Sequence, residues 1–180
     1  MERLNENTER KIKTKYLLKF GYNNLIGKNI RIGKNVSIGS FTIIGDNAII
    51  GDNVTIGNYC EIGKNIIIGN DSILQGRIRT GNDCTIEEKV TIKYGTILTS
   101  GVLLKKNCFI APNVITLGST HERITKHGTV IGENSYIGAG SKIAADIKIG
   151  NDIVVGAIGF VNKDISVPGI YVGVPVKKIK

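Results

Sequence analysis

A strict period of six residues governs the chain from residue 25 to residue 120. The first position of each hexad is aliphatic or Thr, and the second position is Gly in the first eight hexads. The fifth position is small or β-branched throughout. A short repeat of fixed length is typical of a solenoid, in which each repeat packs only against its neighbours.

The spacing of the hexads indicates extended strands. First and fifth positions are four residues apart, so in an extended chain both point to the same side and can fill an interior. Gly at the second position suits the backbone angles and close approach of a corner. Asn and Asp recur just after this Gly, at Asn29, Asn35, Asp46 and Asp52, and suit turn positions of left-handed geometry. A helix would need a period of 3.6, which is absent. We therefore predict an all-β chain.

The period breaks after Thr116. The next hexad would begin at residue 122, but the apolar pattern resumes at Ile131, nine residues later. The additional residues predict a loop near residues 119–129 that is extruded from the solenoid. This loop contains both histidines, His121 and His127. Because loops on a rigid scaffold often carry function, we expect the functional site here.

Length and net charge narrow the classes of partner that the chain could bind. A length of 180 residues is enough for one domain. The net charge of +9 would suit nucleic acid, a solvated basic surface or a phosphorylated ligand. Lysines gather at the C-terminal end and no nucleic-acid motif with interleaved aromatics is present, which favours a phosphorylated cofactor or sugar nucleotide.

The three cysteines occupy fifth positions, so we expect them to point inward. No apolar stretch could span a bilayer, and the start lacks a signal peptide, so we expect a cytoplasmic location.

The repeat divides the chain into three parts. Residues 1–22 precede the repeat. Their pattern predicts a short basic helix with an apolar stripe, which would cap the open edge of the first coil. Peripheral contact of this segment with a membrane is the alternative. The predicted β-helix occupies residues 23–166, and residues 167–180 form a basic tail.

The hexads resemble those of the hexapeptide-repeat acyltransferases, whose fold is a left-handed parallel β-helix with three hexads in each coil. The resemblance covers residues 25–180. The run Ile110-Ala111-Pro112-Asn113-Val114, followed by Thr120-His121-Glu122-Arg123, is similar to the galactoside, maltose and xenobiotic acetyltransferase branch. It implies that acetyl-CoA is the co-substrate and that His121 is the general base for an acceptor hydroxyl. Glu122 or a backbone carbonyl would orient the imidazole.

The C-terminal motifs also resemble that family. Val161-Asn162-Lys163-Asp164 is similar to its Val-Thr-Lys-Asp, and the run from Gly173 to Lys180 is similar to its closing motif. The resemblance implies a coenzyme A groove between the subunits of a homotrimer. The residues implied for this groove are Ala139 and Ala157 along the pantetheine arm, Asn162 and Lys163 further along, and Lys177 and Lys180 at the phosphates.

Several departures from the family pattern bear on the acceptor. Leu98, Thr99 and Ser100 stand where the galactoside enzymes place an acidic pair, which argues against a simple galactoside. Asn162 replaces the usual Thr, and the closing residues are Lys where Arg is common. We expect O-acetylation of a sugar or sugar-nucleotide hydroxyl, in surface polysaccharide or glycolipid biosynthesis.

Other functions fit the sequence less well. The nearest alternative is N-acetylation of an amino-sugar nucleotide, which can proceed without a histidine base. A serine O-acetyltransferase would share Ile-Thr-Leu-Gly and Ile-Gly-Ala-Gly but carry an Asp-His pair that this chain lacks. A γ-class carbonic anhydrase needs three histidines for zinc, and the chain has two, so no metal is expected. A structural or ice-binding β-helix is disfavoured by the mixed outward residues.

Overall fold

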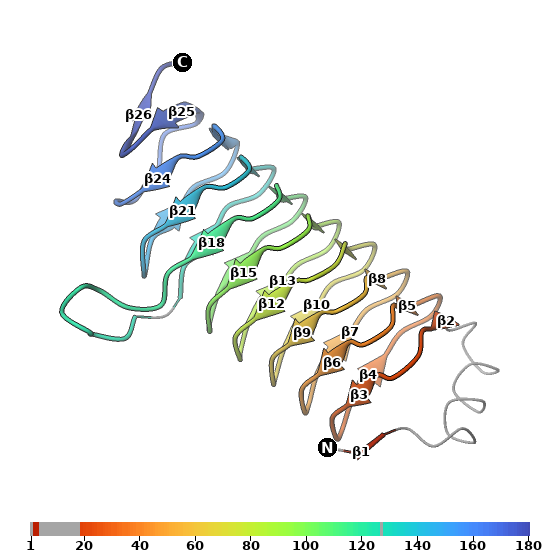
Figure 1. The fold of residues 1–180 in the computed structure, drawn as a ribbon. Helices are drawn as coiled ribbons and strands as arrows, with labels where there is room; N and C mark the ends of the chain where they lie inside the picture. Colours follow the sequence, from red (N-terminus) through yellow and green to blue (C-terminus); the bar gives the residue numbers. More distant parts are fainter. Residues whose placement is uncertain (1, 4–18, 127) are drawn as a thin grey trace.

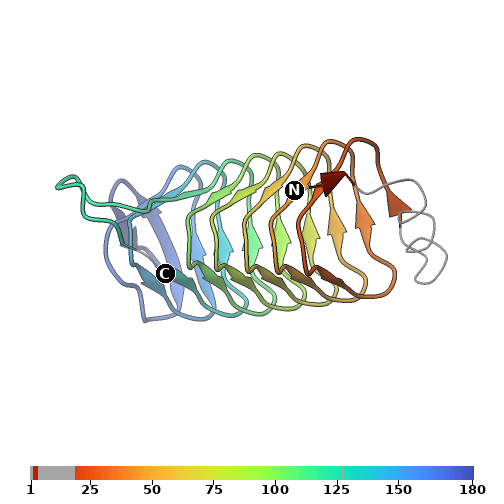
Figure 2. The same cartoon turned by 90° about the horizontal axis from the view of Figure 1, so that it is seen from below.

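The computed structural model describes residues 2–3, 19–126 and 128–180 (Figure 1). Within these residues every regular element is a β-strand, and most strands are two residues long. The strands form three parallel sheets, named here A, C and B in the order in which the chain visits them. Figure 2 shows these sheets as the sides of a long prism.

Along the repeat, each sheet collects one strand from successive coils, and one antiparallel strand is added to sheet A at the N-terminal end and to sheet B at the C-terminal end. Sheet A contains β1 (Glu2–Arg3), β3 (Leu25–Ile26), β6 (Ile43–Ile44), β9 (Glu61–Ile62), β12 (Arg79–Thr80), β15 (Ile97–Leu98), β18 (Ile115–Thr116), β21 (Lys142–Ile143) and β24 (Phe160–Val161). Sheet C contains β4 (Arg31–Ile32), β7 (Ile49–Ile50), β10 (Ile67–Ile68), β13 (Thr85–Ile86), β16 (Leu103–Leu104), β19 (Val130–Ile131) and β22 (Lys148–Ile149). Sheet B contains β2 (Lys19–Phe20), β5 (Ser37–Ile38), β8 (Thr55–Ile56), β11 (Ile73–Leu74), β14 (Thr91–Ile92), β17 (Phe109–Ile110), β20 (Tyr136–Ile137), β23 (Ile153–Val155), β25 (Gly169–Gly173) and β26 (Val176–Lys178).

The register confirms a coil of three hexads. Ile67 pairs with Thr85 and Ile49 pairs with Ile67, so equivalent residues of neighbouring coils are 18 positions apart. First-position side chains such as Ile68 and fifth-position side chains such as Val54 are buried together along the prism.

The three cysteines lie inside this core, as predicted. Cys60, Cys84 and Cys108 are free and buried. Burial raises the pKa of the Cys108 thiol to about 12, because the interior disfavours the thiolate.

The corners show why Gly and Asn recur. A Cβ atom added to Gly57 would lie 1.3 Å from the carbonyl oxygen of Gln75, so the next coil leaves no room for a side chain. The left-handed residue is the fourth of the hexad, for example Asn29 with φ of 56° and Asn47 with φ of 59°. Asn29 and Asn47 are also joined across coils, since the amide of one donates to the oxygen of the other at 3.2 Å.

One detail of the corner prediction was wrong. Asn29 and Asn35 are left-handed as expected, but Asp46 and Asp52 are not among the residues with positive φ, because each lies one position before the left-handed residue. Their carboxylates instead accept hydrogen bonds from the backbone N–H groups of Lys28, at 2.9 Å, and Lys34, at 2.6 Å. The aspartates therefore join neighbouring coils.

The two ends differ in how much of them is described. The N-terminal helix expected within residues 1–22 lies almost wholly outside the described residues. Of residues 1–22, the described strands are β1, which pairs antiparallel with β3, and β2, which pairs parallel with β5. At the other end, residues 167–180, expected as a tail, contain a hairpin in which β25 extends sheet B and β26 pairs antiparallel with it. Among the described residues no helix has the length and apolarity to cross a bilayer.

Candidate active site

The predicted loop leaves the prism where the chain passes from sheet A to sheet C. Ile115 pairs with Lys142, 27 positions away instead of 18, which confirms nine additional residues. The loop closes on itself through a bridge between Ser119 and Thr125 and a hydrogen bond from the N–H of Lys126 to the carbonyl of Gly118 at 2.9 Å. Figure 1 shows it projecting from the body of the prism.

His121 lies in this loop with its side chain 90% exposed. Its Nε2 is 3.5 Å from Oε1 of Glu122. The other carboxylate oxygen of Glu122 accepts a hydrogen bond from Oγ1 of Thr120 at 3.1 Å. The imidazole is thus open to a ligand or a second chain, and the Glu122 carboxylate lies beside it. His127 lies outside the described residues.

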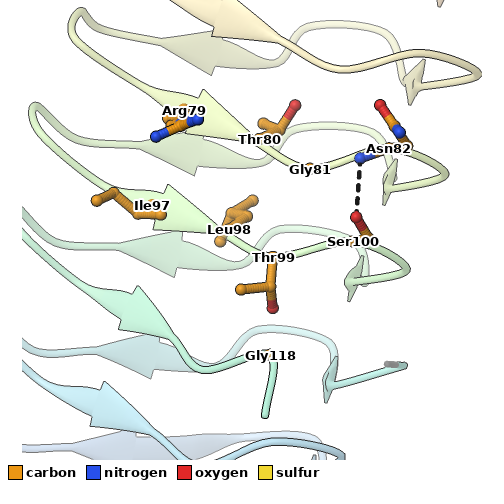
Figure 3. A pocket seen from close by; sticks show the side chains of 9 residues that line it. All are labelled: Arg79, Thr80, Gly81, Asn82, Ile97, Leu98, Thr99, Ser100 and Gly118. Carbon is orange, nitrogen blue, oxygen red and sulfur yellow. Dashed lines mark hydrogen bonds between the residues drawn. The ribbon is translucent and has the colours of Figure 1, made fainter. Parts of the chain in front are cut away.

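A groove of about 500 Å³ lies on the same edge of sheet A as the loop (Figure 3). Its lining residues are Arg79, Thr80, Gly81, Asn82, Ile97, Leu98, Thr99, Ser100 and Gly118. The set contains hydroxyls, an amide and one guanidinium, but no carboxylate. Gly118 joins the groove to the loop that carries His121. The groove therefore offers hydrogen-bonding groups suited to a polyhydroxylated or anionic ligand.

Two inward threonines shape this groove. Thr80 and Thr116 are the two first-position residues of the hexads that are not aliphatic. The hydroxyl of Thr116 accepts a hydrogen bond from the N–H of Thr99 at 2.8 Å and lies 2.9 Å from its Oγ1. The hydroxyl of Thr80 likewise accepts from the N–H of Gly63 at 2.9 Å. Thr99 and Ser100 stood out in the sequence as departures from the family pattern, whereas the role of the two first-position threonines in the groove was not predicted.

The residues expected to bind coenzyme A lie in three places. Ala139 and Ala157 are on successive coils at the corner between sheets B and A, where the N–H of Ile158 donates to the carbonyl of Ala139 at 2.8 Å. Asn162 and Lys163 are exposed at the A–C corner after β24.

The last two expected residues lie in the C-terminal hairpin. Lys177, in β26, pairs with Val172, and the carbonyl of Lys180 accepts from the N–H of Ile170 at 2.9 Å. Both lysine side chains belong to exposed residues.

Within one chain His121 does not meet the Ala139–Ala157 corner. The loop leaves from the A–C edge of sheet A, whereas the two alanines lie at its B–A edge. A site that uses both features would need the loop of one chain beside the corner of another.

The sequence comparisons identify the class of protein, and the structural comparisons identify its fold. A model of the GMPPB C-terminal domain matches residues 18–120, and a model of the bacterial transferase hexapeptide (six repeats) matches residues 128–157. The chain belongs to the family of the GMPPB C-terminal domain and, with it, to the hexapeptide-repeat transferases. Its fold is the left-handed parallel β-helix that the resemblance implied. Comparison with curated proteins gave no match.

Three solved structures share the fold. The acetyltransferase domain of PglB from Neisseria gonorrhoeae FA1090, in complex with acetyl coenzyme A, is 23% identical with a TM-score of 0.57, over 63% of this chain and 51% of that one. The polySia specific acetyltransferase NeuO is 18% identical with a TM-score of 0.55, over 91% and 86%. A Francisella novicida UDP-N-acetylglucosamine acyltransferase is 21% identical with a TM-score of 0.55, over 87% and 63%. The chain thus spans about half the length of the PglB domain.

Proposed function

We propose that this protein is an acetyl-CoA-dependent O-acetyltransferase that acts on a sugar hydroxyl, in surface polysaccharide or glycolipid biosynthesis. The observation that carries the proposal is the exposed His121 beside Glu122, in the loop that interrupts a hexapeptide-repeat β-helix. Similar structures include an acetyltransferase domain with bound acetyl coenzyme A and a polySia specific acetyltransferase. The proposal includes the cytoplasmic location that the sequence favours.

The chemistry follows from the groups in the loop. His121 takes the proton of the acceptor hydroxyl while the hydroxyl oxygen attacks the carbonyl carbon of the thioester. The C–O ester bond forms, the C–S bond breaks, and the imidazolium returns the proton to the leaving thiolate. Glu122, whose Oε1 lies 3.5 Å from Nε2, would orient the imidazole. A free alcohol is a weak nucleophile, so the base is the contribution that the reaction needs most.

The donor would lie along the C-terminal coils. The small side chains of Ala139 and Ala157 would let the pantetheine arm approach the backbone at the B–A corner, and Asn162 and Lys163 would meet the coenzyme from the A–C corner of the last coil. Lys177 and Lys180 would meet the phosphates as point charges.

The separation of His121 from Ala139 and Ala157 within one chain supports a site shared between subunits, in a homotrimer. A mixing experiment tests this: His121→Ala and Ala157→Trp are each inactive alone, because one lacks the base and the other blocks the donor arm. Trimers assembled from both should recover about one quarter of wild-type activity by random mixing. No recovery in mixed trimers, or a fully active monomer in light scattering, would reject the shared site.

The reaction itself is tested by acetyl-CoA turnover against sugars, sugar nucleotides and serine. The proposal expects a product that hydroxylamine cleaves, as it does an ester. An amide product on an amino-sugar nucleotide would overturn O-acetylation in favour of N-acetylation, and turnover restricted to serine would overturn the sugar.

A further inference from the structure

The corner between sheets B and A departs from the other two. At the A–C corner the left-handed positions carry Asn or Asp, apart from Gly101, and most coils of the C–B corner also carry Asn or Asp there. At the B–A corner three successive coils instead carry Phe41, Tyr59 and Arg77, with φ of 56°, 58° and 48°. Bulky side chains are disfavoured in this conformation, which Asn and Gly adopt more readily. Strain of this kind, kept over three coils, points to a use for the side chains.

These residues form one continuous surface with Tyr94 of the next coil. The rings of Phe41 and Tyr59 are stacked, with centroids 5.3 Å apart. The guanidinium carbon of Arg77 is 5.7 Å from the ring centre of Tyr59 and 5.8 Å from that of Tyr94. Phe41, Tyr59 and Tyr94 are 50%, 54% and 49% exposed. We name these four residues the aromatic strip; at about 4.8 Å for each coil it spans about 14 Å.

Corner stability does not account for the strip. At the A–C corner, Asn47 and Asn65 hold neighbouring coils together by an amide hydrogen bond of 3.0 Å. The same residue type would suit positions 59 and 77 with less backbone strain. The strip therefore supplies something that an Asn ladder does not: a cation fixed between rings, with phenol groups on either side.

The chemistry of the strip selects a ligand. A guanidinium held in place by aromatic rings binds a carboxylate through two parallel N–H donors with little loss of freedom. The phenols of Tyr59 and Tyr94 can hydrogen-bond to hydroxyl groups. Nucleic acid fits less well, because bases need free ring faces and here the faces of Phe41 and Tyr59 cover each other.

The strip also lies close to the groove. Arg77 precedes Arg79 by two residues, or about 7 Å of extended chain. Arg79 lies in β12 and lines the groove. A ligand that begins on the strip can thus cross sheet A towards the loop.

We infer that the aromatic strip binds an acidic polysaccharide whose hydroxyl is the acceptor, with Arg77 gripping a carboxylate of the chain. The claim that the bound glycan is the acceptor rests on the proposed function, whereas the claim that the strip binds the glycan does not. It identifies the substrate class as a carboxylate-bearing glycan longer than one sugar.

The experiment compares Arg77→Asn with Lys89→Asn. Lys89 is an exposed cation in the left-handed position of the C–B corner, with φ of 58°, so its variant removes the same charge and relieves the same strain elsewhere. Binding is measured to polysialic acid, polygalacturonate and hyaluronate, with dextran and oligothymidylate as controls. We expect Arg77→Asn to weaken binding to at least one acidic glycan by about tenfold or more, at unchanged thermal stability. Lys89→Asn should bind within about twofold of wild type.

Three results would overturn the inference: no binding of wild type to any acidic glycan, equal losses in the two variants, or tighter binding of oligothymidylate than of the glycans. A loss of binding that follows a loss of stability in Arg77→Asn would also overturn it, since the strip would then be structural. Turnover separates this inference from the proposed function. Sugar acetylation without Arg77-dependent binding rejects the strip alone, and Arg77-dependent binding without acetylation rejects the transferase alone.

Discussion

Replacement of Thr116 by Val tests how the groove is built. The hydroxyl of Thr116, a residue that is 1% exposed, accepts the N–H of Thr99 at 2.8 Å. Val preserves the shape of the side chain but removes the acceptor, so a partly buried N–H is left without its partner. An orphaned donor of this kind costs about 1–3 kcal/mol, and we expect a loss of about 2 kcal/mol in the free energy of unfolding. For a chain of this length that is a fall of about 4–8 °C in Tm.

The matched variant is Thr116→Ser, which keeps the hydroxyl and loses one methyl group. Its expected cost is about 1 kcal/mol, so it should be more stable than Thr116→Val. Thermal unfolding followed by far-UV circular dichroism, at one protomer concentration, gives both values. Thr80→Val should behave like Thr116→Val, because Thr80 accepts the N–H of Gly63 in the same way. A Val variant as stable as wild type, or more stable than the Ser variant, would refute the reasoning.

Two further outcomes follow from the termini and the core. Changing Lys177 and Lys180 together to Ala should lower kcat/KM for acetyl-CoA by roughly ten- to a hundredfold, through a higher KM, because the phosphates of the donor bind alike in the ground and transition states. Acetyl-pantetheine lacks these phosphates, so an equal defect with that donor would assign the two lysines another role. Burial raises the pKa of Cys108 to about 12, so this thiol should resist iodoacetamide at pH 8 in the folded protein and react once the protein unfolds. Mass spectrometry would detect the label, and rapid labelling of the folded protein would contradict the burial of Cys108.

The repeat made most of the fold predictable. An aliphatic first position and a small fifth position require a shared interior, and Ile68 and Val54 occupy it. The positions of the left-handed residues were harder to predict from the sequence, because Asp46 and Asn47 are both plausible turn residues. Only the register of neighbouring coils shows that the carboxylate of Asp46 reaches the N–H of Lys28.

The candidate site was predictable in part. The break in the period located the loop and His121, because an insertion into a strict repeat has to leave the stack. The sequence did not show that Ala139 and His121 lie at opposite edges of sheet A, since that depends on which hexad meets which sheet. The aromatic strip was not predicted either, because Phe41, Tyr59 and Arg77 are each 18 residues apart in the sequence and only the structure shows their side chains in contact.

The most direct test of the account is kcat of His121→Ala at saturating acetyl-CoA and acceptor. Loss of a general base predicts a fall on the order of 10²–10⁴-fold, with acetyl-CoA binding and circular dichroism unchanged. His127→Ala, which alters the other histidine of the same loop, is the control and should retain turnover. Near-normal turnover in His121→Ala together with its loss in His127→Ala would contradict the account.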